Sequence, residues 1–453
     1  MTPHAQRRAS AKTREGSVLI IVLWVCFGLV SLTLYFAHSM SMELRASNNR
    51  LAGAEAEMAI DGAAQYVSNI LARLEEPGEI PDRDTYGREA MPVGNAYFWF
   101  LGRPEAEEQL APDQASFALV DEASKIHLNT APAAMLEGLP GMTAELAAAI
   151  VDWRDEDSDV TSGGAEDDTY LRLTPAYHCK NLPFETVGEL RLVTGFELVF
   201  LFGEDANLNG VLDPNENDGD VTPPFDNANG RLEAGLLEYV TVYSRESNLR
   251  EDGTQKINVA DNNPQALREF LRETFSEDRA GEIMGRLNGP PGSIDSLLAL
   301  YMRSGMTEDE WAQVSGELAA TDEPYTEGLI NVNTASEAVL AAIPGIGADN
   351  ASKLLAHRGS NPDSLNSLAW VAEVLEQEDA LQAGPFLTAL SHQFTADIAA
   401  VGRQGKGYRR VKLVFDTSEG RPKSLFRQDL SHMGWALGWR TRELLKEAGR
   451  VSL

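Results

Sequence analysis

The sequence contains few cysteines and few basic residues. Its 453 residues include two cysteines, Cys26 and Cys179, which excludes a framework held by disulfides. Lys and Arg number 38 against 69 Asp and Glu, so the formal net charge is −31. Because phosphate affinity comes mainly from basic side chains that release counterions, this charge argues against a general binder of polyanions. It favours a solvated surface, a calcium-rich environment or a basic partner.

Motifs of the common enzyme classes are also missing. The chain has no G-x-S-x-G elbow and no G-x-x-x-x-G-K-[ST] phosphate loop. Its seven histidines are scattered and form no Cys/His cluster of the kind that binds zinc. His178 and Cys179 are adjacent along the chain, which is not the geometry of a catalytic pair. We therefore predict that the protein is not an enzyme.

Proline is absent between Pro3 and Pro77, and this region holds a long apolar run. Residues 1–16 carry four basic side chains, whereas residues 17–37 carry no charge. As a helix, the uncharged segment spans roughly 30 Å, the thickness of a bilayer core. Its basic flank should stay in the cytoplasm, which leaves the bulk of the chain outside the inner membrane. An ordinary cleaved signal peptide is the alternative, but its apolar part is shorter, about 7–15 residues.

The helical pattern continues beyond the apolar run. Leu44, Leu51 and Met58 are seven residues apart. The apolar stripe then continues through Ile60, Ala63, Val67, Ile70 and Leu74. We therefore predict one helix from about Ser17 to Glu75, with its first half in lipid and one face of its second half packed on a domain.

A short basic leader ending in glycine, an uncharged span and a long amphipathic continuation resemble the type IV pilin and pseudopilin superfamily. The resemblance implies that a prepilin peptidase cuts after Gly16 and makes Ser17 the mature N-terminus. Most members carry Glu at the fifth mature position, where its carboxylate can neutralise the amine of a neighbouring subunit in lipid. Here that residue is Ile21. Among pseudopilins, the missing carboxylate is the mark of the minor pseudopilin K family of the type II secretion system.

Two stretches of the chain match each other at an offset of 204 residues. They are IHLNTAPAAMLEGLPG from Ile126 and INVNTASEAVLAAIPG from Ile330, and Arg154 further along falls on Arg358. In each, Asn-Thr predicts the start of a short helix, Pro-Gly predicts a tight turn, and a second helix follows. This is the pattern of a helix-hairpin-helix. A third stretch, from Ile257, keeps only the first part.

Hairpins of this kind can bind nucleic-acid phosphates through the backbone N–H groups of the turn, helped by nearby basic residues. Around these two turns the nearest basic residue is Lys353, and the other charged neighbours are Glu137, Glu145, Asp152, Glu337 and Asp349. We therefore predict packing modules and no nucleic-acid partner. A membrane-tethered protein for DNA binding or DNA uptake is the alternative. DEASKIHLNTA and GGAEDD also resemble pseudopilin K, in which a helical domain with hairpin-like, SAM-like subdomains interrupts the pilin body.

The segment DANLNGVLDPNE matches the calcium-loop pattern D-x-[DN]-x-[DN]-G-x5-E without a gap. Such a loop converges six to eight oxygens on one hard cation. The predicted ligands are the side chains of Asp205, Asn207, Asn209, Asp213 and Glu216 and the backbone carbonyl of Val211. Because NDGDVTPP follows, no exiting helix is expected, and we predict a lone calcium loop. A solvated turn rich in Asp and Asn is the alternative.

A second acidic stretch, DWRDEDSDVTSGGAEDD, holds eight carboxylates and one basic residue, Arg154. The resemblance to pseudopilin K implies calcium in the helical domain, so this stretch is a possible second metal cluster. Its candidate ligands are Asp155, Asp157, Asp159, Glu166, Asp167 and Asp168. A solvated acidic surface explains the stretch equally well.

Strand-like segments lie on both sides of the hairpins, and the resemblance assigns them to one sheet. We predict an α+β fold: a pilin-like long N-terminal helix packed on a small antiparallel sheet, with a large inserted helical domain containing two SAM-like hairpin subdomains. The expected divisions are a leader (1–16), a membrane segment (17–37), the first part of the pilin body (38–120), a first subdomain with the calcium loop (121–256), a second subdomain (257–390) and closing strands (391–453).

The resemblance implies a minor pseudopilin that caps the tip of a periplasmic pseudopilus together with other minor pseudopilins. Ile21 gives a subunit stacked above no carboxylate, and an insertion of roughly 270 residues is difficult to place inside a close-packed shaft. The implied partners are other minor pseudopilins, the pseudopilus and secretion platform, the prepilin peptidase and the inner membrane. A calcium-binding adhesin on a type IV pilus is a further alternative.

Overall fold

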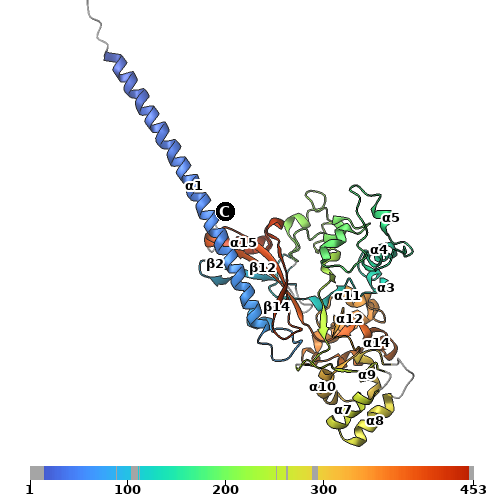
Figure 1. Ribbon diagram of the computed structural model, residues 1–453. Helices are drawn as coiled ribbons and strands as arrows, with labels where there is room; N and C mark the ends of the chain where they lie inside the picture. The colour runs from blue at the N-terminus through green and yellow to red at the C-terminus, as the bar shows by residue number, and fades with distance from the viewer. Residues whose placement is uncertain are drawn as a thin grey trace, which may run out of the picture.

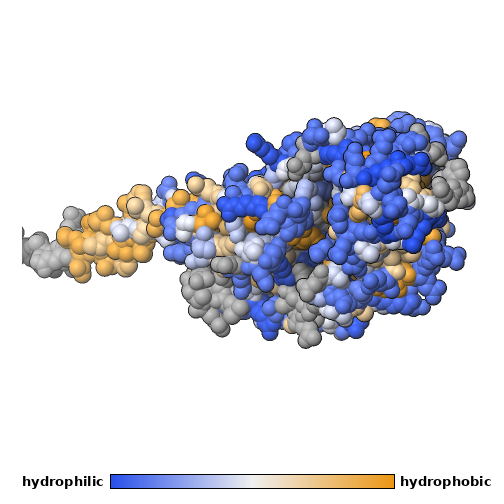
Figure 2. All heavy atoms as spheres, turned by 90° about the horizontal axis from the view of Figure 1, so that it is seen from below, coloured by the Kyte–Doolittle hydropathy of each residue, from blue (hydrophilic) through white to orange (hydrophobic). Residues whose placement is uncertain are grey.

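The computed structural model describes residues 15–87, 89–103, 111, 113–250, 252–261, 264–287 and 294–447. The most prominent element is α1 (Glu15–Leu71), a helix of 57 residues that projects from the rest of the molecule (Figure 1). Its first part is apolar on all sides and exposed, whereas the body is mainly hydrophilic on the face seen in Figure 2. It is the one described helix that is long and apolar enough to cross a membrane. The predicted single long helix is therefore confirmed.

The second part of α1 packs on a sheet through small side chains. The buried face consists of Ala52, Ala56, Ala59, Ile60, Ala63, Val67 and Leu71. The prediction that the residues at positions 44, 51 and 58 belong to this face is wrong: Leu44 is 63% exposed, Leu51 45% and Met58 69%. The alanines let the helix approach closely, since a Cβ at Gly402 would lie 2.1 Å from the carbonyl oxygen of Ala52. The larger side chains therefore lie on the outer face.

The sheet is antiparallel, in the order β1-β2-β12-β13-β14, with β3 paired to the start of β12. Its strands are β1 (Met91–Val93), β2 (Ala96–Leu101), β3 (Val120–Asp121), β12 (Gln393–Val401), β13 (Arg409–Asp416) and β14 (Lys423–Asp429). One face contacts α1 and forms a core around Phe98, Phe100 and Ile398, and the other packs Trp99 against Leu437. We refer to α1 and this sheet as the pilin body. It also carries α2 (Arg83–Tyr86) and, at its C-terminal end, α15 (Gly438–Glu447).

The remaining described residues between β3 and β12 form an inserted domain. Because β3 and β12 pair, with Asp121 opposite Phe394, the chain leaves and re-enters the pilin body at one place. Asp121 also accepts hydrogen bonds of 2.5 Å from the hydroxyls of Thr334 and Ser391. Burial outweighs these hydrogen bonds and raises the pKa of Asp121 to about 6. The predicted α+β fold, with a helical domain inserted into a pilin-like body, is confirmed.

The inserted domain contains three modules, each closed by a two-residue parallel ladder. The ladders pair β4 (Ile126–His127) with β5 (Val240–Thr241), β7 (Ile257–Asn258) with β8 (Leu318–Ala319), and β10 (Ile330–Asn331) with β11 (Leu387–Thr388). An antiparallel pair, β6 (Arg245–Ser247) with β9 (Tyr325–Glu327), connects the segments between the modules. The incomplete third stretch of the sequence thus opens a complete module of its own.

The helices distribute over these modules as follows. The first has α3 (Ala133–Glu137), α4 (Ala144–Arg154), α5 (Asp167–Tyr170) and α6 (Leu198–Phe202). The middle one has α7 (Gln265–Thr274), α8 (Glu277–Leu287), α9 (Leu297–Ser304) and α10 (Glu308–Val314). The last has α11 (Glu337–Ala342), α12 (Gly347–Ser360), α13 (Val371–Val374) and α14 (Gln377–Ala383). The first and last modules share one core, whereas the middle module has a separate core around Leu271, Ile283 and Trp311.

Candidate functional site: hairpin turns and acidic loops

The residues repeated in the two hairpins hold the fold together. Arg358, on α12, is buried and donates to the carbonyls of Val332 and Ala335 at 3.3 and 3.0 Å. Arg154, at the equivalent place on α4, donates to the carbonyls of Leu128 and, at 2.6 Å, Ala131. These acceptors are again 204 residues apart. The repeated arginines therefore fasten the second helix of each hairpin to the turn before the first.

The repeated asparagines are also used internally. Asn129 exchanges two hydrogen bonds with the backbone of Phe184, at 3.0 and 2.7 Å. Asn333 donates to the carbonyl of Leu365 at 2.9 Å and accepts from the Trp370 indole at 3.2 Å. Hydrogen bonds of this kind fix each hairpin on the segment that follows it. The polar groups of both asparagines therefore already have hydrogen-bond partners within the protein.

Other parts of the chain contact both Pro-Gly turns. At Gly141 (φ 72°) an added Cβ would lie 2.8 Å from the ring of Phe200. At Gly345 (φ 87°) an added Cβ would lie 2.5 Å from the carbonyl oxygen of Asp379, a residue of α14 in the same module. A phosphate that approached either turn would have to displace these neighbours and would meet acidic side chains.

We therefore expect the protein not to bind DNA through its hairpins. In a mobility-shift experiment with duplex DNA at low salt, where electrostatic binding is strongest, the detergent-solubilised chain should produce no shift. A known helix-hairpin-helix DNA-binding protein serves as the positive control. Submicromolar binding that weakens steeply with salt would contradict this expectation.

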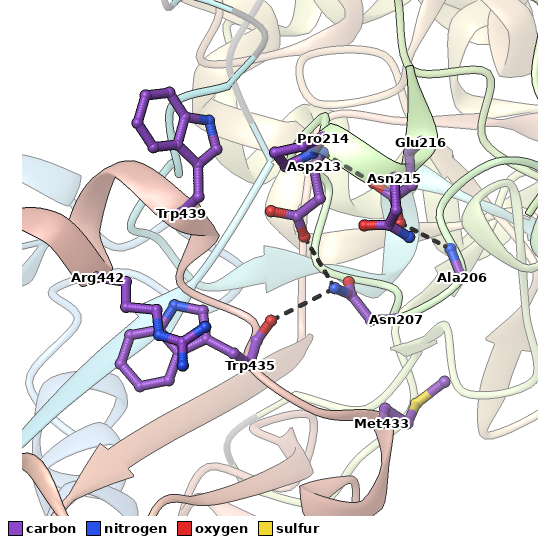
Figure 3. Close-up of a pocket in the computed structure, with 10 residues that line it drawn as sticks. All are labelled: Ala206, Asn207, Asp213, Pro214, Asn215, Glu216, Met433, Trp435, Trp439 and Arg442. Carbon is purple, nitrogen blue, oxygen red and sulfur yellow. Dashed lines mark hydrogen bonds between the residues drawn. The ribbon is translucent and has the colours of Figure 1, made fainter. Parts of the chain in front are cut away.

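The first acidic loop, Asp205–Glu216, is separated from the end of α6 by two residues and ends in a 3-10 turn, Pro214–Glu216, whose residues are drawn in Figure 3. Residues 217–235, all of them described, contain no helix, as expected for a lone loop. The carboxylate of Asp205 accepts the N–H groups of Asn209 and Gly210 at 2.9 and 2.8 Å. Gly210 has a φ of 70°, which permits the sharp turn.

The candidate ligands of this loop lie together. Asn207 and Asn209 both donate to one carboxylate oxygen of Asp213 at 3.0 Å. Glu216 folds back and accepts the N–H groups of Ala206 and Asp213 at 3.1 and 3.0 Å. Among the described residues, no three His, Cys, Asp or Glu side chains form a metal cluster by themselves. A cation here would therefore also need the amide oxygens and the backbone carbonyl of Val211.

The electrostatics of this loop are unfavourable without a cation. Asp205, Asp213 and Glu216 are all buried. Burial, reinforced by the charges of Asp205 and Asp213, raises the pKa of Glu216 to about 8. Burial also raises the pKa of Asp205 and that of Asp213. Three buried carboxylates that repel each other, in a loop of oxygen-bearing side chains, are what a hard divalent cation would stabilise, so the residues fit calcium.

A shortened copy of this loop follows 20 residues later. Asn227 and Asn229 both donate to the carboxylate of Glu233 at 2.8 Å, as Asn207 and Asn209 do to Asp213. The position equivalent to Asp205 is Phe225, and the copy is largely exposed. It therefore lacks both the first carboxylate and the burial of the Asp205–Glu216 loop.

The second acidic stretch forms a partly buried cluster at the end of α4. Both carboxylate oxygens of Glu166, one of Asp155 and the amide oxygen of Asn181 are buried with no donor in hydrogen-bonding geometry in the described part of the chain. Asp152 is fully buried, and both its oxygens lie 3.2 Å from the Thr161 amide nitrogen. Burial and neighbouring carboxylates raise the pKa of Glu166 and that of Asp155.

The structure divides the six candidate ligands of this stretch. Asp155 and Glu166 lie in the cluster, whereas Asp157, Asp159 and Asp168 are exposed. Asp167 is used elsewhere: it contacts His178 at 2.9 Å and accepts the N–H of Cys179 at 2.8 Å. The sequence analysis did not select Asp152 and Asn181. Asp152 lies on the last turn of α4, and Asp155, three residues later, follows directly after the end of that helix.

A long, partly apolar helix on an antiparallel sheet, interrupted by hairpin modules, defines a pilin-like protein with an inserted helical domain. Two family models match the chain, at residues 130–199 and 330–395, and both are described as type II secretion system (T2SS), protein K. The chain thus carries two domains of the type II secretion system protein K family, which confirms the resemblance seen in the sequence.

Individual relatives cover different parts of the chain. The type II secretion system protein K of Klebsiella pneumoniae is 39% identical over 66 residues, which are 14% of this chain and 20% of that protein. The match thus spans about a fifth of the relative's length. Among solved structures, a chain of the GspK-GspI-GspJ complex of the enterotoxigenic Escherichia coli type 2 secretion system is 12% identical. That comparison covers 88% of this chain and 99% of the other, with a TM-score of 0.36.

Proposed function

We propose that the protein is a non-enzymatic minor pseudopilin of the type II protein secretion system. The main support is the combination of an exposed apolar helix with two protein K domains inserted into a pilin body. The apolar part of α1 would anchor the chain in the inner membrane, with the bulk in the periplasm. DNA uptake has no comparable support, because the hairpin residues are used internally.

We further propose that the subunit caps the tip of the pseudopilus with other minor pseudopilins. Ile21 provides no carboxylate for the amine of a subunit above. All three inserted modules lie beside the pilin body and away from the apolar part of α1 (Figure 1), where they would obstruct neighbours in a shaft. The exposed stripe of Leu44, Leu51 and Met58 offers a helix face for a partner on the side opposite the sheet.

The proposal that the protein is a pseudopilin predicts its processing. A prepilin peptidase should cut after Gly16, so the membrane-extracted protein should begin at Ser17. Intact-mass spectrometry would detect this N-terminus, and Gly16→Val should abolish it. An unprocessed Met1, or a cut near Ala37 as in an ordinary signal peptide, would argue against a pseudopilin.

The proposed place at the tip predicts the effect of a single substitution. Ile21→Glu should let further subunits stack above this one, so purified pseudopili should contain more copies of it per filament. Ile20→Glu, which adds the same charge one position earlier, is the matched control and should not have this effect. If quantitative immunoblotting shows unchanged stoichiometry for Ile21→Glu, the argument from the missing carboxylate is wrong.

We also propose that the Asp205–Glu216 loop binds calcium. Its ligands would be the side chains of Asp205, Asn207, Asn209, Asp213 and Glu216 and the carbonyl of Val211, and the cation would supply the charge that offsets three buried carboxylates. Asp152, Asp155, Glu166 and Asn181 form a second candidate site, supported by the buried oxygens of Asp155, Glu166 and Asn181 that have no donor among the described residues. Removal of calcium is therefore expected to destabilise the inserted domain.

A further inference from the structure

The pilin body holds the backbone of the Asp205–Glu216 loop. Arg410, on β13, is fully buried and donates to the carbonyls of Asn207 and Leu208 at 2.5 and 2.7 Å. Arg103, just after β2, lies against Gly210, where an added Cβ would be 3.0 Å from its side chain. The loop belongs to the inserted domain, so these contacts join parts of the chain about 100 and 200 residues apart.

These two arginines are already paired with carboxylates outside the loop. Arg410 donates to both oxygens of Asp397 at 2.9 and 2.6 Å, and Arg103 donates to both oxygens of Glu238 at 2.6 and 2.8 Å. They contribute hydrogen bonds to the loop, and the charge of Arg103 also acts on Asp205, but both guanidinium groups are shared with carboxylates outside the loop. The carboxylates of the loop are therefore still not neutralised by a positive charge of their own. The carbonyls of Asn207 and Leu208, in contrast, accept hydrogen bonds from Arg410 of the pilin body.

The C-terminal segment contacts the same loop. Asn207 donates to the carbonyl of Trp435 at 3.4 Å, and a Cβ at Gly438 would lie 3.1 Å from Val211. Figure 3 shows Met433, Trp435, Trp439 and Arg442 opposite Asp213 and Glu216, around a cavity of about 520 Å³. The loop thus lies between β13 and the segment that leads into α15.

We propose that the Asp205–Glu216 loop is a cation-controlled latch between the inserted domain, the pilin sheet and the C-terminal segment. The inference rests on the calcium binding proposed above. A bound cation draws the side-chain oxygens inward and leaves the carbonyls of Asn207 and Leu208 directed at Arg410. Without it, repulsion among the carboxylates opens the loop, and Arg410 loses these acceptors. The contacts of Asp121 with Ser391 and of Arg245 with Asp416 still hold the inserted domain at its other junction.

Hydrogen–deuterium exchange on the full chain in detergent, with calcium or chelator, tests the latch. Calcium should slow exchange by about fivefold or more in residues 205–216 and also in residues 409–412 and 433–439, as coupling between the sites requires. The β6–β9 ladder should not respond. Isothermal titration calorimetry of the same chain measures whether calcium binds at all. If calcium binds but slows exchange only in residues 205–216, the latch is overturned and the calcium site stands. Absence of any heat would overturn both.

Coupling is reciprocal, so a change in the pilin body should alter the calcium affinity of the loop. Arg410→Met should weaken calcium binding by about fivefold or more in a calorimetric titration. Arg245→Met is the matched control: it removes the Arg–Asp pair at the other junction between the inserted domain and the pilin body, does not alter the loop, and should leave the affinity unchanged. An equal affinity in Arg410→Met and the unaltered chain would overturn the proposal. If Arg410→Met does not fold, the exchange experiment on the unaltered chain decides.

Discussion

Calcium is expected to raise the melting temperature of the full-length, detergent-solubilised protein, and a chelator is expected to lower it. Extracellular calcium modules bind at about 0.1–1 mM. For a dissociation constant of about 0.1 mM, 10 mM free calcium adds about 2.7 kcal/mol to the free energy of unfolding. The effect arises because the cation relieves the repulsion among Asp205, Asp213 and Glu216, which is strong in a buried loop.

Substitutions separate this effect from general ionic effects. The double change Asp205→Ala, Glu216→Ala should remove most of the calcium response in differential scanning calorimetry. Glu233→Ala, which alters the equivalent carboxylate of the shortened loop, is the matched control and should keep it. Magnesium should substitute poorly, because it requires a smaller octahedral shell and retains its waters. Melting curves that coincide in calcium and chelator would show that the loop is only a turn.

Arg358→Met is expected to destabilise the last hairpin module by about 2–3 kcal/mol. The change removes two hydrogen bonds from a buried guanidinium and leaves the carbonyls of Val332 and Ala335 without this donor. A buried acceptor that loses its partner costs about 1–3 kcal/mol. Arg154→Met should have a similar but smaller effect in the first module, because Arg154 is only partly buried.

Urea unfolding, followed by circular dichroism, measures these differences. Lys353→Met is the matched control, since Lys353 is an exposed basic residue on the same helix, where it donates to Asn350 at 2.9 Å. Its effect should stay within about 0.5 kcal/mol. Equal unfolding midpoints for the Arg358 and Lys353 variants would contradict the structural role assigned to the repeated arginines.

Local patterns were sufficient for several features of this protein. The uncharged run from Ser17 to Ala37 and the lack of proline up to Pro77 predict a single long helix, and α1 runs unbroken to Leu71. A repeat at a constant offset predicts two hairpins, and even their hydrogen bonds repeat at that offset. These predictions succeed because backbone periodicity, turn residues and charge act over a few neighbouring residues.

Contacts between distant segments could not be predicted in the same way. The seven-residue spacing of Leu44, Leu51 and Met58 suggested the buried face of α1, yet the sheet takes the alanine face because its backbone at Gly402 approaches closely. Apolar spacing identifies a stripe but does not decide which stripe meets the sheet. The middle module was also missed as a unit, because the stretch from Ile257 keeps only the first part of the repeat and nothing in the sequence marks its closing strand, Leu318–Ala319.

The sequence by itself indicated the class of protein through its resemblance to a known family. It also determined the two hairpins and the oxygen-bearing residues of the Asp205–Glu216 loop, since these depend on residue types at short, regular spacings. Only the tertiary structure decided which groups are buried without partners and which segments meet. It brought Asp152 and Asn181 to Glu166, and Arg410 to the carbonyls of Asn207 and Leu208. Burial and charge pairing depend on neighbours that the folded chain brings together from far apart, and no local pattern encodes them.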